Sequence, residues 1–132
     1  MRKYTTVEQG NFGVSHAIAY FTSLGYTACV PLNDSRYYDL VVEKDEKFFT
    51  VQVKTSAYSR YGNFTVNLKS VRPNRTQNKI VNFDNSRIDF VYILTSNNIS
   101  YCIPANKIKS KVQITLNSKL DKYRVEILWR DD

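Results

Sequence analysis

Three side chains near the middle of the chain have the types and spacing needed to hold a metal ion beside a phosphate. Asp39 lies near the start of the stretch YYDLVVEKDEKFFTVQVKTS, and Gln52 and Lys54 lie two residues apart near its end. An aspartate and a neighbouring oxygen ligand can hold a hard cation such as Mg²⁺, and the carbonyl group of Val53 could add a ligand. A bound metal ion can polarise a phosphate and activate water. Lys54 could orient that water or offset negative charge on the phosphorane.

These residues converge if residues 37–56 form a hairpin. The sequence KDEK predicts its turn, with Asp45 and Glu46 as the two central residues. Counting outward from this turn places Asp39 opposite Gln52, with Cβ atoms about 5 Å apart. Alternation then predicts one apolar face and groups Asp39, Gln52 and Lys54 on the other. A simpler interpretation stays open, in which an exposed polar face carries a surface ion pair.

Composition limits the class of protein. The chain has 132 residues, of which 42 % are hydrophobic and 23 % charged, as expected for a single globular domain spanning residues 1–132. No apolar run approaches the ~20 residues of a membrane span, and the first residues lack the apolar core of a signal peptide. We therefore expect a cytoplasmic protein with no membrane partner and no organic cofactor. Cys29 and Cys102 lack metal-ligand spacing and are expected to be buried free thiols.

The net charge of +7 is concentrated in two segments. The first segment has no acidic residue between Lys47 and Phe83, and the second has only Asp121. Such blocks suit a polyanion, of which nucleic acid is the common one, although a well-solvated surface would have the same composition. The basic residues are Lys47, Lys54, Arg60, Lys69, Arg72, Arg75 and Lys79 in the first segment, and Lys107, Lys109, Lys111, Lys119, Lys122 and Arg124 in the second.

A helix followed by several strands predicts an α/β (α+β) fold with a central mixed sheet. The helix is capped by Thr5 or Thr6, carries an apolar stripe and ends at Gly25, although Gly10 and Gly13 leave open a start nearer Phe12. The expected strands cover residues 26–32, 37–43, 48–54, 63–69, 88–96, 99–103, 112–117 and 123–129. Residues 70–86 are expected to form a polar loop broken by Pro73, and Pro104 to start a helical turn.

The stretch YYDLVV…FFTVQVKT resembles the core of the PD-(D/E)XK nuclease superfamily, with an Asp on one strand and an E/Q-x-K on the next. Upstream, GNFGVSHAIAYFTSLGYTACV is similar to the first helix and strand of that superfamily, including a Gly-aromatic step at Gly25-Tyr26. Downstream, IDFVYIL and SYCIPANKI resemble the later core of the branch that holds group I intron homing endonucleases. The resemblance covers about residues 5–110, and Tyr38 replaces the proline of the motif.

This resemblance implies a restriction-endonuclease-like core, in which helices flank the central sheet, and a Mg²⁺-dependent, sequence-specific endonuclease acting on double-stranded DNA. Asp39 and Gln52, with the carbonyl group of Val53, would bind the metal ion, and Lys54 would be catalytic. The superfamily usually has a supporting Glu in the first helix, where this chain has Ser15. Glu8 is the only acid in that segment. It would either complete the site or serve as a helix-start carboxylate.

The resemblance also leads to expectations about His16, the assembly and the contacts with DNA. His16, the sole histidine, would be a general base, a phosphate contact or a packed residue. Cutting both strands of a duplex implies a homodimer or homotetramer, with Trp129 near the contact. The alternatives are a Holliday-junction resolvase and a DNA-binding module without cleavage. Residues 58–79 would form a DNA-contacting arm, with the candidates Arg60, Asn63, Asn67, Lys69, Arg72, Arg75, Gln77 and Lys79.

Overall fold

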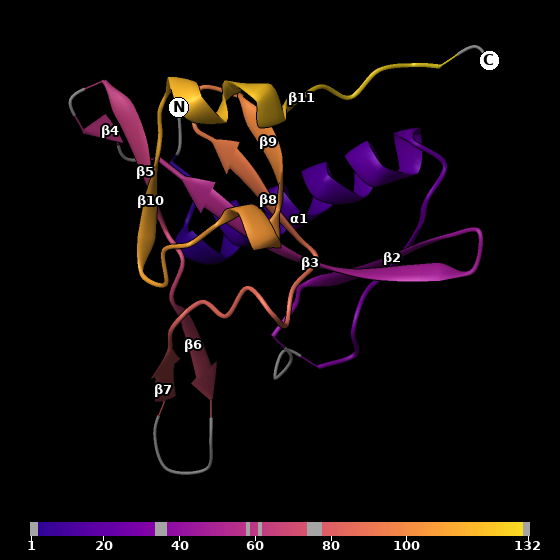
Figure 1. Cartoon of the computed structure of the whole chain (residues 1–132), viewed down its shortest axis with the longest axis horizontal. Helices are drawn as coiled ribbons and strands as arrows, with labels where there is room; N and C mark the ends of the chain where they lie inside the picture. The colour runs from indigo at the N-terminus through magenta and orange to yellow at the C-terminus, as the bar shows by residue number, and fades with distance from the viewer. Residues whose placement is uncertain (1–2, 34–36, 58, 61, 74–77, 131–132) are drawn as a thin grey trace.

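One long helix lies against one face of a mixed sheet, and short strands and 3₁₀ helices cover the other face (Figure 1). The computed structural model describes residues 3–33, 37–57, 59–60, 62–73 and 78–130. The helix is α1 (Thr6–Ser23), and the 3₁₀ helices are η1 (Ala105–Lys107) and η2 (Ser118–Tyr123). No helix of the described residues is long and apolar enough to cross a membrane. This α+β architecture with a mixed central sheet confirms the predicted fold class.

The central sheet has six strands in the order β1-β2-β3-β8-β9-β11. Only β3 and β8 run parallel to each other, because the chain between them crosses over through two smaller sheets. The strands are β1 (Thr27–Cys29), β2 (Leu40–Lys44), β3 (Lys47–Ser56), β8 (Phe90–Thr95), β9 (Ser100–Pro104) and β11 (Arg124–Val125). The smaller sheets contain β4 (Ser59–Arg60), β5 (Asn63–Asn67) and β10 (Gln113–Leu116), and β6 (Ser70–Pro73) with β7 (Asn78–Val81).

Helix α1 starts at its first available cap. Thr5 is the N-cap, and Glu8 completes a capping box with it, so the helix begins at Thr6 rather than near Phe12. Gly25, at φ +90°, follows the C-cap residue Leu24 and ends the helix as predicted. The predicted apolar stripe of α1 contributes the buried Ala17 and Phe21 to the core.

The β2–β3 hairpin has the predicted turn and register. Asp45 and Glu46 adopt φ values of +53° and +66°, the left-handed conformation of a two-residue turn of the I′ type. Leu40 pairs with Val51 and Val42 with Phe49, which is the register counted from that turn. Leu40, Val42 and Val51 are fully buried beneath α1, so the apolar face of the hairpin is the face that packs on the helix.

Two apolar cores lie on opposite faces of the central sheet. The core on the α1 side consists of Ala17, Phe21, Leu40, Val42, Val51 and Tyr92. The core on the other side is formed by residues of β5, β8, β9, β10 and η1, including Val91 and Ile93. Strand β8 therefore contributes to both cores, which confirms the prediction of an apolar strand buried on both faces.

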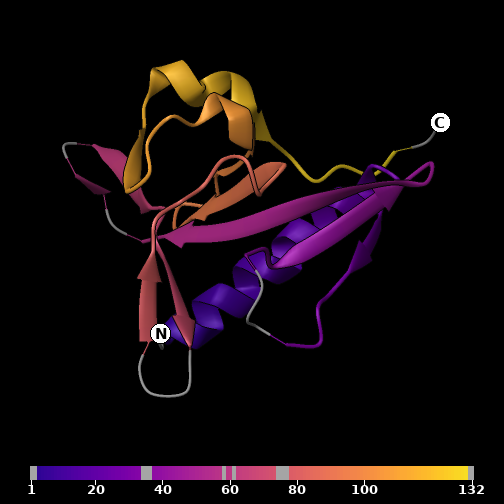
Figure 2. The same cartoon turned by 60° about the horizontal axis from the view of Figure 1, so that its bottom comes forward.

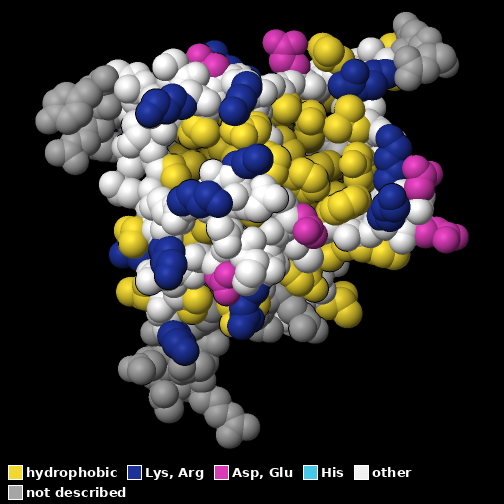
Figure 3. All heavy atoms as spheres, viewed as in Figure 1, with side chains coloured by type: hydrophobic (Ala, Val, Ile, Leu, Met, Phe, Trp, Pro, Cys, Tyr) yellow, Lys and Arg dark blue, Asp and Glu magenta, His cyan; other side chains and the backbone are white. Residues whose placement is uncertain are grey.

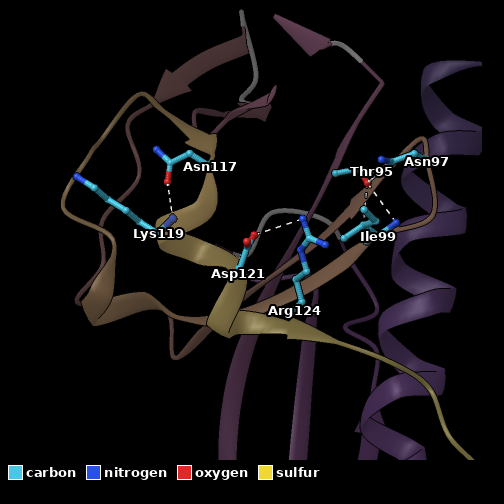
Figure 4. Close-up of polar contacts among 7 residues, drawn as sticks. All are labelled: Thr95, Asn97, Ile99, Asn117, Lys119, Asp121 and Arg124. Atoms are coloured by element: carbon cyan, nitrogen blue, oxygen red, sulfur yellow. Dashed lines mark hydrogen bonds and ion pairs between the residues drawn. The ribbon is translucent and has the colours of Figure 1, made fainter. Parts of the chain in front are cut away.

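A hydrogen-bonded turn joins β8 to β9 at the predicted Asn97-Asn98. Asn98 is left-handed at φ +65°. The Oγ1 atom of Thr95 lies within hydrogen-bond distance of the side-chain oxygen of Asn97 and the carbonyl group of Ile99, and it accepts from the N–H of Ile99 (Figure 4). Because these bonds close the turn, β9 returns directly beside β8, antiparallel to it.

Three sequence predictions are wrong. The strands expected over residues 26–32 and 123–129 are reduced to the short edge strands β1 and β11. Residues 70–86 are not a polar loop, because β6 and β7 pair across a hairpin that projects from the body in both views (Figures 1 and 2). The ends of this hairpin are held side by side: the N–H of Leu68 donates to Val112 at 2.8 Å and that of Phe83 to Lys111 at 3.0 Å. Cys29 is exposed rather than buried, because β1 is an edge strand, whereas Cys102 is partly buried.

Candidate active site

Asp39 is held at the end of the β2–β3 hairpin by a bond to the opposite strand. Its carboxylate accepts a hydrogen bond of 2.7 Å from the N–H of Val53, and its own N–H donates to the carbonyl group of Val51 at 2.9 Å. The regular pairing of β2 with β3 ends at Leu40 and Val51, and these two bonds hold Asp39 against the β3 backbone on either side of Gln52. The direct opposition of Asp39 and Gln52 stays a prediction.

Gln52 is a buried polar residue with an incomplete set of partners. Its Nε2 group donates to the hydroxyl group of Ser70 at 3.0 Å and, more weakly, to the carbonyl group of Tyr37 at 3.4 Å. Its Oε1 atom is buried and has no hydrogen-bond partner among the described residues. An orphaned buried oxygen costs about 1–3 kcal/mol unless a ligand satisfies it. A cation is one such ligand.

Lys54 lies on the same face of β3, two residues further along. Directly paired residues share a face, and Gln52 and Lys54 pair with Val91 and Ile93 of the second core. Both side chains therefore lie at the border of that core, which explains the burial of Gln52 and the half-burial of Lys54. The ammonium group of Lys54 donates to the carbonyl group of Lys69 at 3.0 Å, just before β6 begins.

The oxygen donors present suit a hard cation but are few. Asp39 provides an anionic carboxylate with about four lone-pair positions, of which one accepts from Val53. The Oε1 atom of Gln52 adds a neutral donor across the hairpin. No group of three or more His, Cys, Asp or Glu side chains within the described residues could hold a metal ion. These residues therefore fit a cation that keeps several water ligands, as Mg²⁺ does.

Glu8 takes part in the start of α1. Its carboxylate accepts from the N–H of Thr5 at 2.9 Å, and its N–H donates to the hydroxyl group of Thr5 at 3.1 Å. This capping box supports the helix-start interpretation of Glu8. Ser15, at the position where the superfamily usually has a Glu, is exposed on α1.

His16 packs against the sheet. Its Nδ1 atom is hydrogen-bonded to the hydroxyl group of Tyr92 at 2.7 Å, and its ring stacks on Phe12 with centroids 6.3 Å apart. Burial lowers the pKa of His16 from 6.5, and burial raises the pKa of Tyr92 to about 12. These contacts support the alternative in which His16 is a packed residue, with a neutral imidazole hydrogen-bonded to a buried tyrosine.

The predicted DNA-contacting arm is divided between two hairpins. Asn63 lies on β5, and Asn67 accepts a hydrogen bond of 2.9 Å from the N–H of Lys69 in the turn that follows. Lys79 is exposed on β7. Arg60 and Arg72 lie on β4 and β6, whereas Arg75 and Gln77 fall outside the described residues.

The second basic segment lies in the layer that covers the face of the central sheet away from α1. Figure 3 shows Lys and Arg side chains spread over the face that carries β10 and η2. The one acid of this segment, Asp121, forms an ion pair of 3.3 Å with Arg124, and Asn117 caps η2 by accepting from Lys119 (Figure 4). Since Asp121 is the one acid among six basic residues of this segment, the segment keeps a net positive charge.

Four neighbours of the site were not found from the sequence. Ser70 and the backbone of Tyr37 orient the Gln52 amide, and the guanidinium group of Arg87 lies 4.3 Å from the ring centroid of Tyr37. Asp89 binds the N–H of Thr50 at 2.8 Å, two residues before Gln52. All of these contacts join residues more than ten positions apart, so no local pattern marks them.

Comparisons with known proteins agree with this geometry. A family model described as PD-(D/E)XK endonuclease matches residues 4–132. Among solved structures, a bacterial homing endonuclease, I-Ssp6803I, superposes with a TM-score of 0.76 at 24 % sequence identity, over 92 % of this chain and 89 % of that one. No curated protein matches the chain. The central mixed sheet with α1 on one face is therefore a restriction-endonuclease-like fold, as the sequence resemblance predicted.

Proposed function

The chain belongs to the PD-(D/E)XK endonuclease family and is a nuclease, and from this premise we propose that it is a Mg²⁺-dependent, sequence-specific endonuclease that hydrolyses phosphodiester bonds in double-stranded DNA. The observation that carries the proposal is that Asp39 is hydrogen-bonded to the β3 backbone on both sides of Gln52, whose buried Oε1 atom has no partner among the described residues. Lys54 follows on the same face of the same strand. The proposed site combines an acid, an orphaned oxygen donor and an ammonium group.

Each residue of the site has a proposed task. Asp39 and Gln52, with the carbonyl group of Val53, would hold Mg²⁺, and Glu8 is retained as a candidate helper. When bound, Mg²⁺ would polarise the scissile phosphate and favour ionisation of a water molecule. The ammonium group of Lys54 would offset the negative charge that develops on the phosphate.

The proposed DNA surface is basic and lies around the site. The described candidates Asn63, Asn67, Lys69 and Lys79 lie on or beside the two hairpins that follow β3. Lys69 lies directly beside the site, because its carbonyl group accepts from Lys54. The remaining candidates, Arg60, Arg72, Arg75 and Gln77, stay proposals from the sequence.

A dimer or tetramer follows from the symmetry of the substrate. The two strands of a duplex are antiparallel, so one binding event that cuts both needs two sites related by a two-fold axis. Ile127, Leu128 and Trp129 leave exposed apolar surface near the C-terminus and are the proposed contact. Sedimentation at micromolar concentration, with and without DNA, tests this assembly: a monomer in both states would exclude concerted double-strand cleavage.

The proposed biological type is a homing endonuclease, by analogy with the structural neighbour. A DNA-binding module without cleavage is the rival, because a neutral Gln occupies the second acidic position and no cluster of three acids or other metal-binding groups occurs among the described residues. A Holliday-junction resolvase shares the same core and remains the other alternative.

One assay separates these functions. The protein is incubated with supercoiled plasmid that carries a candidate target, with a four-way junction and with a linear duplex, each with and without Mg²⁺. We expect Mg²⁺-dependent cleavage of the plasmid and the duplex at one position. Selective cutting of the junction would favour a resolvase. DNA binding without cleavage in the presence of any metal ion would show that the protein is a DNA-binding module.

A further inference from the structure

The projecting β6–β7 hairpin has an apolar pair that the folded chain leaves uncovered. Val71 and Ile80 are directly paired across the two strands, so their side chains share a face. Val71 is 57 % exposed and Ile80 is 67 % exposed. Figures 1 and 2 show the hairpin extending away from the body, and Figure 3 shows apolar side chains beside basic ones in this region.

The charge around this pair points to a particular kind of partner. The exposed Lys79 neighbours Ile80 in the strand and therefore lies on the opposite face of the ribbon. The chain has no acidic residue between Lys47 and Phe83, so Arg72 and Lys79 give the ribbon strands a positive charge that no acid of this segment offsets. A partner with an apolar protein surface would gain nothing from the basic residues of the ribbon. A polyanion that also exposes apolar groups between its charges would contact both the basic residues and the apolar pair. Duplex DNA is such a partner.

Resting on the proposed function, we propose that the β6–β7 ribbon enters the major groove and that Val71 and Ile80 contact the C5-methyl groups of thymine. The major groove, about 12 Å wide, admits a two-stranded ribbon, and it is the groove in which the thymine methyl group is exposed. Phosphates line both walls of the groove, within reach of a lysine side chain such as that of Lys79. The apolar pair thus reads thymine, while the basic residues hold the backbone.

The test removes the methyl groups from the DNA rather than from the protein. Duplexes of random sequence are first selected for binding to the wild-type protein in EDTA, which yields a preferred sequence. Each thymine of that sequence is then replaced by deoxyuridine, which keeps the base pairing and loses only the methyl group. Binding is measured by fluorescence anisotropy. We expect at least one position at which uracil weakens binding about fourfold, the factor that burial of one such group contributes.

Protein variants identify the residues that contact these methyl groups. Val71→Ala and Ile80→Ala should each weaken binding to the thymine duplex, by roughly fivefold, and should reduce the effect of uracil at the sensitive position. Val7→Ala, which truncates a valine on α1 that is also exposed, at 72 %, is the matched control and should leave both quantities unchanged.

The outcomes separate this inference from the proposed function. If a sequence is selected and cut but uracil has no effect at any thymine, the ribbon does not read methyl groups and the inference is wrong. The same conclusion follows if Val71→Ala and Ile80→Ala leave DNA binding intact and instead dissociate the oligomer, because the pair would then be a subunit contact. If no sequence is selected and no DNA is cut, the proposed function itself fails.

Discussion

The carboxylate of Asp39 accepts a hydrogen bond of 2.7 Å from the backbone N–H of Val53. This bond joins the first residue beyond β2 to the middle of β3, where a regular ladder bond would otherwise be needed. It thereby fixes Asp39 beside Gln52 and orders the end of the hairpin. The same side chain thus organises the local backbone and supplies the anionic donor that we assign to the metal ion together with Gln52, with Glu8 as the candidate helper.

Asp39→Asn should abolish cleavage and leave DNA binding nearly intact. The amide oxygen can still accept from Val53, so the hairpin end keeps its geometry, but the anionic ligand is lost. Plasmid cleavage in Mg²⁺ and anisotropy in EDTA measure the two quantities. A variant that cuts at the wild-type rate would show that Asp39 is not a ligand.

Lys54→Met should lower the cleavage rate by at least ~10²-fold, as expected for a group that stabilises developing charge. Lys47→Met, which removes an exposed lysine at the far end of the same strand, is the control and should change the rate little. Single-turnover rates and affinities are compared for both variants. A fall of only a few-fold, matched by an equal loss of affinity, would make Lys54 an ordinary phosphate contact.

Gln52→Glu should keep activity or lower the Mg²⁺ concentration required, because a carboxylate binds Mg²⁺ more strongly than an amide does. Without metal the variant should be less stable than wild type, since the buried carboxylate cannot donate to Ser70 or Tyr37. Mg²⁺ should therefore raise its melting temperature more than that of the wild type. If Gln52→Ala titrates with Mg²⁺ like the wild type, the Oε1 atom is not a ligand.

Gly13→Ala should destabilise the protein although it improves helix propensity. A Cβ atom at Gly13 would lie 2.6 Å from Cγ2 of Thr55 and 3.2 Å from Cγ1 of Val53, so the helix would be pushed off β3. We expect a net loss of about 1–2 kcal/mol in the free energy of unfolding. Gly10→Ala is the control: nothing lies within 4 Å, and the change should stabilise by up to about 1 kcal/mol. Equal effects in urea titrations would contradict the close approach of α1 to β3.

Stability should fall as pH decreases through the range in which free histidine titrates. Burial lowers the pKa of His16 below 6.5, so in that range the unfolded chain binds a proton that the folded chain does not. Its ring contacts, Phe12 and Tyr92, carry no charge there, since burial raises the pKa of Tyr92 to about 12. His16→Gln should flatten the dependence of urea midpoints on pH between about 5 and 7.5. An unchanged slope would show that other groups cause it.

The hairpin register and the helix ends were predicted correctly because they depend on local chemistry. The hairpin register depends on a two-residue turn and on alternation along two short strands, and both signals lie within residues 37–56. The ends of α1 follow from Thr5, Glu8 and Gly25 in the same way. The sequence alone therefore predicts the position of Asp39 at the end of this hairpin, beside β3, and the face that Gln52 and Lys54 share.

Long-range contacts explain what the sequence missed. The β6–β7 hairpin reads as a polar loop because Pro73 and several amides interrupt it, and its apolar signal is one cross-strand pair, Val71 and Ile80. The orientation of the Gln52 amide depends on Ser70, eighteen positions away. Cys29 lies in an apolar segment, but the exposure of an edge strand depends on which strands are its neighbours.

The way in which the β6–β7 hairpin is attached has a consequence for how such a protein can change its target. Its two ends, at Leu68 and Phe83, are hydrogen-bonded to the consecutive residues Val112 and Lys111, so the chain leaves and rejoins the body at nearly the same place. Substitutions, insertions or deletions between those points need not move any strand of the central sheet. Provided that Ser70 keeps its bond to Gln52, a β6–β7 hairpin that recognises DNA as proposed can diverge during evolution, or be exchanged by design, independently of the proposed active site.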